Sequence, residues 1–117
     1  MFVSIGIYMK TPQRIKKDNE FRDPRLSLIE VQEIFKMMGN HYRLKILIEL
    51  GKQKNLTLDQ INQLVGGDFA NISAHTKKMQ KAGLIKKKYQ DVHVLHTLTL
   101  NGRRALQALD KFNYSIE

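Results

Sequence analysis

The sequence predicts a small, mainly helical domain of the α+β type, with four helices, a two-stranded hairpin and a last helix. Its length of 117 residues fits one compact core. From Ser27 onward, apolar residues recur at the three- and four-residue spacing of helices, and over residues 84–100 they alternate as in strands. A hydrophobic share of 42% with only two prolines is typical of a folded chain.

Residues 1–25 are predicted to form an N-terminal arm, and residues 26–117 the folded domain. In the arm, apolar residues alternate from Val3 to Met9 and would share one face of an added edge strand or docked extension. No basic region precedes them and no small-residue cleavage site follows, so a signal peptide is not expected. No segment approaches the roughly 20 apolar residues of a membrane span. The chain has no cysteine, which fits a reducing interior, and we expect a cytoplasmic protein.

The first two predicted helices meet at a glycine and a capping residue. The first runs from Ser27 to Gly39, and the second is capped by Asn40 and runs through Leu50, where Gly51 is expected to end it. The apolar positions are Leu28, Val31, Ile34, Phe35 and Met38 in the first helix and Leu44, Leu47, Ile48 and Leu50 in the second.

The third and fourth helices are short and are separated by Gly66-Gly67. Thr57 and Gln60 have the spacing of a capping box at the start of the third helix. Asp68 caps the fourth helix, which extends to about Ala82. The inward positions are Leu58, Ile61, Leu64 and Val65 in the third helix, and Ile72, His75 or Thr76, and Met79 in the fourth. Little of the fourth helix therefore needs burial.

The hairpin is predicted over Leu84–Tyr89 and Val92–Leu100. Its tip lacks the glycine favoured in tight hairpins and carries Asp91, which a phosphate backbone would repel, so deep insertion into a minor groove is not expected. Thr99 can cap a last helix that extends to Phe112. Its apolar positions are Ala105, Leu106, Leu109 and Phe112.

Two short helices joined by a tight glycine turn are typical of a helix-turn-helix, and here residues 68–82 would form the recognition helix. A helix that enters the major groove needs a face free of bulky core residues and supplied with hydrogen-bonding groups. Asparagine can pair with adenine, lysine can donate to guanine, and an alanine methyl can contact a thymine methyl. The candidate base-contacting residues are Asn71, Ser73, Ala74 and Lys77. A solvated helix face is the alternative interpretation.

The positive charge is concentrated beside this helix. The chain has 20 lysines and arginines against 11 acidic residues, a net charge of +9. Between Lys77 and Arg104 there are eight basic residues and a single acid, Asp91, so this stretch carries most of the excess. Contact with phosphates would release counterions and give an affinity that falls steeply with salt.

Three segments resemble winged helix-turn-helix transcriptional regulators. Residues 35–47 (FKMMGNHYRLKIL) and 72–85 (ISAHTKKMQKAGLI) resemble the second helix and the recognition helix of the ArsR type. Residues 98–103 (LTLNGR) are similar to the segment that leads from the wing to the last helix in MarR-like and PadR-like relatives. The resemblance covers Ser27 to Phe112. It implies a two-stranded wing, a C-terminal helix and the base contacts named above. The implied phosphate contacts are Arg43, Lys78, Lys86, Lys87 and Lys88, to which the basic stretch adds Lys81.

A homodimer is predicted because the first and last helices carry more apolar surface than one small core consumes. The interface candidates are Leu28, Val31, Phe35, Leu106, Leu109 and Phe112. Two-fold symmetry would match a pseudo-palindromic site with half-sites about one helical turn apart.

Metal binding and catalysis are not expected. ArsR-type metal sensors use cysteine pairs or paired histidine and carboxylate ligands, whereas this chain lacks thiols, and His93 and His96 would point to opposite faces of a strand. His75 is expected to pack under the recognition helix. No nucleophilic triad, phosphate-binding loop or dinucleotide motif is present, and no pattern indicates a cofactor or a small-molecule effector.

The predicted function is that of a sequence-specific regulator that binds double-stranded DNA. One alternative is a winged helix that uses its lysine-rich face to bind an acidic protein. A second is RNA binding, which requires exposed aromatic residues that stack on bases. Only Phe69 and Tyr89 are candidates for that role.

Overall fold

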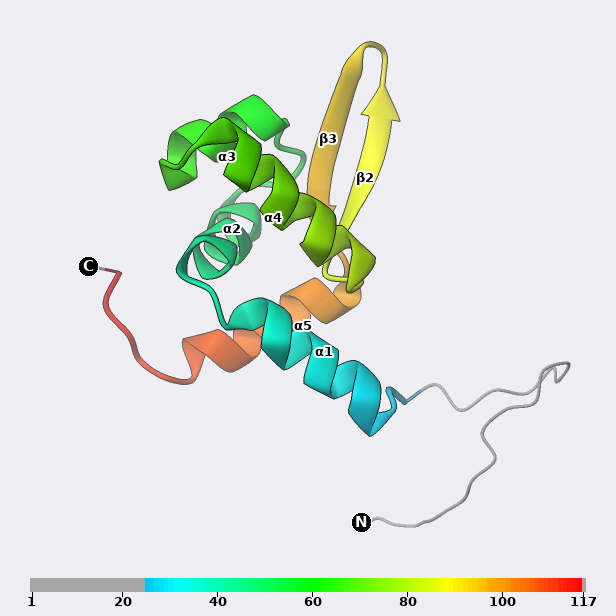
Figure 1. Ribbon diagram of the computed structural model, residues 1–117, viewed down its shortest axis with the longest axis vertical. Helices are drawn as coiled ribbons and strands as arrows, with labels where there is room; N and C mark the ends of the chain where they lie inside the picture. The colour runs from blue at the N-terminus through cyan, green and yellow to red at the C-terminus, as the bar shows by residue number, and fades with distance from the viewer. Residues whose placement is uncertain (1–24, 117) are drawn as a thin grey trace, which may run out of the picture. The chain divides into compact units, whose positions relative to one another are not determined.

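The computed structural model describes residues 25–116 (Figure 1). The predicted arm and its alternation from Val3 to Met9 lie outside these residues. The chain divides into two units between Glu30 and Val31. The elements are α1 (Leu28–Met38), α2 (His41–Lys52), α3 (Leu58–Val65), α4 (Phe69–Lys81), β2 (Ile85–Gln90), β3 (His93–Leu98) and α5 (Leu100–Asp110). This order confirms the predicted winged helix-turn-helix fold, with a C-terminal helix after the hairpin.

Each predicted N-cap lies where the sequence places it. Asn40, Thr57, Asp68 and Thr99 each accept a hydrogen bond from a backbone N–H in the first turn of the next helix. Thr57 and Gln60 form a reciprocal capping box, since the Thr57 N–H donates to Gln60 Oε1 at 2.8 Å and the Gln60 N–H donates to Thr57 Oγ1 at 3.2 Å. Short polar residues thus set the start of four helices.

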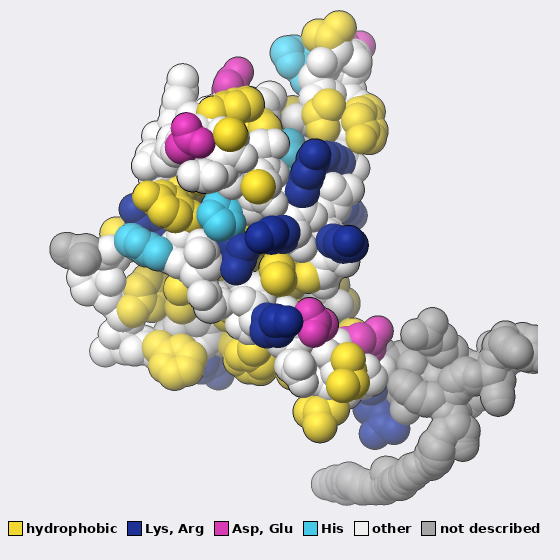
Figure 2. Space-filling model, in the orientation of Figure 1, with side chains coloured by type: hydrophobic (Ala, Val, Ile, Leu, Met, Phe, Trp, Pro, Cys, Tyr) yellow, Lys and Arg dark blue, Asp and Glu magenta, His cyan; other side chains and the backbone are white. Residues whose placement is uncertain are grey.

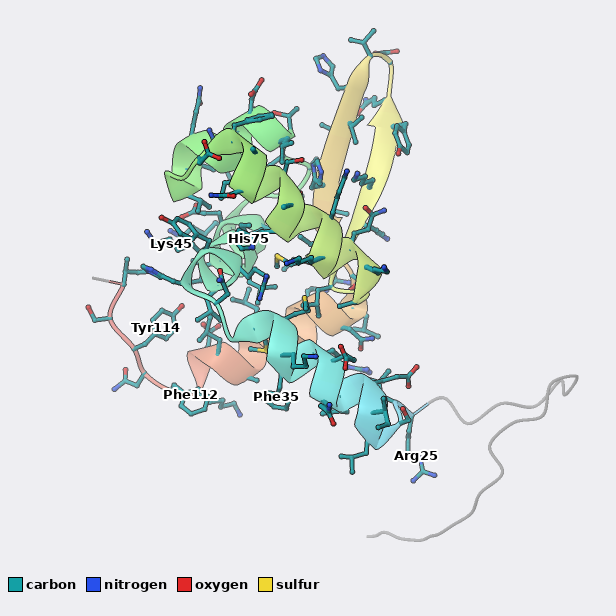
Figure 3. The ribbon with its side chains drawn as sticks, in the orientation of Figure 1. Arg25, Phe35, Lys45, His75, Phe112 and Tyr114 are labelled. Atoms are coloured by element: carbon teal, nitrogen blue, oxygen red, sulfur yellow. The ribbon has the colours of Figure 1, made fainter. Side chains whose placement is uncertain are left out.

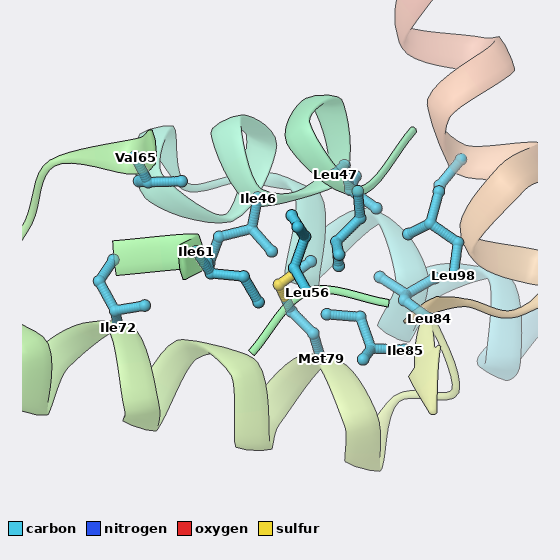
Figure 4. Packing of buried hydrophobic residues seen from close by; sticks show 12 residues of the cluster. Ile46, Leu47, Leu56, Ile61, Val65, Ile72, Met79, Leu84, Ile85 and Leu98 are labelled. Atoms are coloured by element: carbon cyan, nitrogen blue, oxygen red, sulfur yellow. The ribbon is translucent and has the colours of Figure 1, made fainter. Parts of the chain in front are cut away.

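The core lies between α2, α3, α4 and the inner end of the hairpin (Figure 4). Ile46 and Leu47 are fully buried, although only Leu47 was among the predicted inward positions of α2. Leu64 was predicted to point inward and is instead 44% exposed, because α3 is only eight residues long and buries Ile61 and Val65. The buried apolar residues are Ile46, Leu47, Leu50, Leu56, Ile61, Val65, Ile72, Met79, Leu84, Ile85, Leu98 and Ala105.

Gly51 does not end α2, contrary to the prediction. The helix continues to Lys52 and is closed by the Gln53 N–H, which donates to the Glu49 carbonyl at 3.0 Å. A Cβ at Gly51 would collide with the side chain of Leu106 from α5. Gly51 therefore allows two helices to approach, which is a packing role that spacing along α2 alone does not reveal.

The start of α5 is held against the turn that follows α4. The Thr99 N–H donates to the Leu84 carbonyl at 3.1 Å, and Thr99 Oγ1 donates to the Gly83 carbonyl at 2.5 Å. One turn later, a Cβ at Gly102 would collide with the Leu84 carbonyl oxygen. The helix then ends at Asp110, two residues before the predicted end, so Phe112 lies in the turn beyond it.

The hairpin is antiparallel, with Ile85 opposite Leu98 at its base and Gln90 opposite His93 near its tip. Two residues close it, and Asp91 adopts the left-handed region at φ 56°. Aspartate tolerates that region better than most residues, which explains how the turn forms without glycine. At its base, His96 also pairs with Leu56 in an isolated bridge, so the segment before α3 is hydrogen-bonded to β3.

Buried His96 makes the stability of the domain sensitive to acid. Burial lowers the pKa of His96 below its usual 6.5 and Lys87 lowers it further, although a hydrogen bond to the Leu56 carbonyl opposes the shift. Below pH 6.5 the unfolded chain therefore binds more protons than the folded one, and we expect the free energy of unfolding to fall as the pH is lowered. Chemical unfolding of wild type and His96→Gln across this range should show a weaker pH dependence in the variant. His93→Gln, at an exposed position of the same strand, is the control, and an equal reduction there would contradict the assignment.

Candidate nucleic-acid interface

The inner side of α4 packs against the core through a narrow stripe. Ile72, Thr76 and Met79 are buried, and Thr76, which is only 2% exposed, takes the inward position that the sequence left open between itself and His75. Thr76 Oγ1 donates to the Ser73 carbonyl at 2.9 Å, which satisfies the buried hydroxyl. Three buried side chains anchor this 13-residue helix, and most of its other side chains are exposed.

The outer face of α4 carries small and polar side chains. Asn71, Ala74 and Lys77 are exposed, whereas Ser73 is half-buried. At about 100° per residue, Ala74 lies near the centre of this face, and Asn71 and Ser73 lie on its two flanks, roughly 160° apart. The side-chain amide of Asn71 has no hydrogen-bond partner among residues 25–116. Its backbone N–H donates to Asp68 Oδ2 at 3.2 Å.

The turn before α4 sets the angle between the two helices of the motif. Gly66 closes α3 in the left-handed region at φ 76°, and its N–H donates to the Asn62 carbonyl at 2.8 Å. A Cβ on Gly67 would lie 3.1 Å from the Ile72 side chain and 3.2 Å from the Tyr42 ring. Gly66 therefore suits the left-handed conformation of this turn, and Gly67 leaves room for the close approach of Ile72 and Tyr42.

The lysines next to α4 are available to an anionic partner. Lys78 and Lys81 on α4 and Lys86 and Lys88 on β2 are exposed, and Figure 2 shows dark blue side chains gathered on the face that carries α4 and the hairpin. Within the part of the chain that the structure describes, none of them pairs with a carboxylate; the ion pairs found there join Lys36 to Glu33 and Lys52 to Glu49. Lys87 is half-buried and lies opposite His96 in the hairpin.

Arg43, a predicted phosphate contact, is half-buried and engaged within the domain. Its Nε donates to the Met37 carbonyl at 2.8 Å, and its Nη1 lies 3.1 Å from His75 Nδ1. The His75 ring is half-buried and stacks on Tyr42, with 6.0 Å between ring centroids and 18° between planes. Burial lowers the pKa of His75, and the positive charges of Arg43 and Lys78 lower it further. Sequence spacing gave no sign of this contact between residues 32 positions apart.

Aromatic and aliphatic side chains are exposed on two other parts of the surface. Tyr89 and Val92 lie near the tip of the hairpin, where Val92 is 89% exposed, and Phe69 is partly exposed at the first position of α4. Phe35 on α1 and Phe112 after α5 are 60% and 77% exposed, and Figure 3 shows where both lie.

The predicted interface residues of the first and last helices differ in burial. Leu28 is exposed, and Val31 and Leu109 are half-buried. Leu106 contacts the core of its own chain beside Gly51. The side chain of Leu106 is thus partly buried within its own domain, while the side chains of Phe35 and Phe112 remain exposed.

Between Arg25 and Ile116 no three histidine, cysteine or carboxylate side chains gather closely enough to hold a metal ion. No helix in that stretch has the length and apolar character needed to cross a lipid bilayer.

Comparison with known proteins shows similarity to solved winged-helix structures. The transcriptional repressor PagR of Bacillus anthracis is 28% identical, with a TM-score of 0.64 over 70% of this chain and 94% of its own. HlyU of Vibrio cholerae is 20% identical, with a TM-score of 0.64 over 72% of this chain and 91% of its own. A Mycobacterium bovis protein, described as a possible ArsR-family regulator and solved as a homodimeric DNA-binding domain, is 18% identical, with a TM-score of 0.66 over 74% and 80%. No protein-family model and no curated protein sequence matches the chain.

Proposed function

We propose that this protein is a transcriptional regulator that binds double-stranded DNA and places α4 in the major groove. The observation that carries the proposal is the outer face of α4, which is exposed, polar and free of large apolar side chains, with unpaired lysines beside it. This is the surface that base edges and phosphates require. The similarity to PagR, a repressor of nearly the same length as the matched region, supports the same role.

Within this proposal, Asn71, Ala74 and Lys77 contact bases, because they are the exposed members of the predicted set. The Asn71 amide suits adenine, the Lys77 ammonium suits guanine and the Ala74 methyl suits a thymine methyl. Ser73, half-buried on the opposite flank from Asn71, would reach only a base edge or sugar at the side of the groove.

The phosphate contacts come from exposed lysines on α4 and on the strand that follows it. Lys78 and Lys81 extend from the helix itself, and Lys86 and Lys88 from β2. Lys87 makes a weaker phosphate contact than these four lysines because it is half-buried. Asp91 and exposed Val92 keep the tip of the hairpin free of positive charge, so the grip is expected along the hairpin and not at its tip.

Replacing Lys86 and Lys88 together by alanine is expected to weaken binding to all duplexes alike. Each lost phosphate contact lowers the slope of log K against log salt by about 0.9, so the double variant should have a slope shallower by roughly 1.8. Titration of duplex at several salt concentrations measures it. Lys111→Ala, at an exposed position after α5, is the matched control. An unchanged slope in the double variant would remove the hairpin from the interface.

The proposed function is tested by selecting bound duplexes from a random pool. We expect a recovered motif, together with non-specific binding that collapses as salt is raised. No detectable duplex binding at low salt would contradict the proposal and favour an acidic protein as the partner of the lysine-rich face.

We further propose that the regulator acts as a homodimer through α1 and α5. Exposed Phe35 and Phe112 support it, as does the homodimeric state of the Mycobacterium bovis domain. The selected motif should then be a pseudo-palindrome with half-sites about one helical turn apart. Sedimentation that shows only monomer at micromolar concentration would overturn this part alone.

A further inference from the structure

Arg43 connects three helices through one planar side chain. Its Nε donates to the carbonyl of Met37 in the last turn of α1, and its Nη1 contacts Nδ1 of His75 in the middle of α4. A guanidinium can only donate hydrogen bonds, so Nδ1 must be the acceptor and the His75 ring must be neutral in this contact. Figure 3 shows His75 between α2 and α4.

The surroundings of His75 favour this neutral state. Its ring stacks on Tyr42, and the Lys45 ammonium lies 6.0 Å from the centre of the Tyr42 ring. Within residues 25–116 no carboxylate pairs with the imidazole. The charges that act on His75 are those of Arg43 on α2 and Lys78 on α4, and the Tyr42 ring that stacks on it is itself in contact with His41 and Lys45. A proton on Nδ1 would place two cations 3.1 Å apart and end the contact.

We propose that Arg43 is a positioning residue that acts through His75: together they fix α4 against the end of α1, and Arg43 does not grip a phosphate. This inference rests on the proposed function. The contacts with Met37 and His75 occupy the Nε–H and one N–H of Nη1, so a phosphate could reach only the N–H groups that remain, and only from the exposed side of this half-buried side chain. Because α1 belongs to the proposed dimer interface and α4 reads bases, the pair also links the pairing of two chains to the placement of their recognition helices.

Arg43→Lys separates this role from phosphate binding. Lysine keeps the positive charge but lacks the fork that reaches two acceptors at once. If Arg43 positions α4, Arg43→Lys and Arg43→Ala should both reduce the ratio of binding to a selected duplex over a scrambled duplex by roughly tenfold, the size of one lost base contact. The salt slope on the scrambled duplex should stay that of wild type.

The pH dependence of the same ratio tests the part of His75. For wild type, the ratio should fall only at pH values below the usual histidine pKa of 6.5, because burial and the nearby cations lower the pKa of His75 and Nδ1 is protonated only there. His75→Gln supplies an acceptor that does not titrate, so its ratio should match wild type at neutral pH and change less on acidification. His93→Gln, at an exposed position on the hairpin, is the control. Thermal unfolding of each variant shows whether the domain stays folded.

The positioning role of Arg43 and His75, called the relay below, and the function on which it rests fail on different outcomes. A wild type that binds no duplex at low salt overturns the proposed function, and the relay with it. A wild type that binds, with Arg43→Lys equal to wild type and Arg43→Ala weaker on both duplexes with a slope shallower by about 0.9, makes Arg43 a phosphate contact and overturns the relay alone. If the ratio of selected to scrambled binding in both Arg43→Ala and Arg43→Lys equals that of wild type, the relay is also overturned and the proposed function stands.

Discussion

Replacing Gly102 by alanine is expected to lower the free energy of unfolding by about 3 kcal/mol, near the upper end of overpacking costs. The new methyl group would collide with the Leu84 carbonyl oxygen, and backbone cannot move aside as a flexible side chain can. Relieving the collision requires α5 to move away from the turn at Gly83. That movement would also strain the two hydrogen bonds that Thr99 makes there.

The measurement is thermal or chemical unfolding of the full chain. A loss of about 3 kcal/mol corresponds to a fall in Tm of roughly 12–24 °C for a domain of this size. Gly39→Ala is the matched control, since a Cβ there meets only ordinary contacts at 3.6 and 3.7 Å and the backbone is not left-handed. Its free energy of unfolding should stay the same or rise slightly. Equal stability of the two variants would show that α5 does not press on this turn.

Replacing Asn71 by alanine is expected to reduce affinity for the selected duplex by about 30-fold, or about 2 kcal/mol, and to relax base preference at one position. The exposed amide has no partner among residues 25–116, so its removal costs the fold little. Binding to a scrambled duplex should barely change, because the variant keeps every lysine.

Titration with both duplexes, and with variants of the selected motif, measures this effect. Gln80→Ala is the control: Gln80 is exposed on the same helix but near its C-terminal end, away from the turns that enter the groove first. If Asn71→Ala keeps the discrimination of wild type, the base-contacting face lies elsewhere on α4. Lys77 and Ala74 would then be tested next.

Local chemistry explains why so much of the fold could be predicted. The caps at Asn40, Thr57, Asp68 and Thr99 use hydrogen bonds that close within three residues, so the sequence alone places them. The thin apolar stripe of α4 likewise follows from helical spacing. These features, together with the change to alternation after Gly83, predict the helix-turn-helix and the hairpin, and the resemblance to winged-helix regulators implies that the hairpin is a wing.

What escaped prediction depends on contacts between distant segments. Gly51 looked like a helix end, and only its contact with Leu106 shows its packing role. Leu64 had an inward spacing but remains exposed on a short helix. For the candidate site, spacing identified exposed Asn71 and Lys77, whereas the Arg43–His75 contact requires the packed arrangement of α2 and α4.

The bridge between Leu56 and His96 fixes the base of the hairpin, called its root here, to the segment before α3, and leaves the tip without such a contact in the described part of the chain. Side chains are buried at its root and exposed at its tip, so the helical body holds the hairpin at its root. Its angle is thereby fixed at the same place that supports the helix-turn-helix. The residues beyond the bridge are held by the pairing of β2 and β3, so the tip has the least support from the helical body.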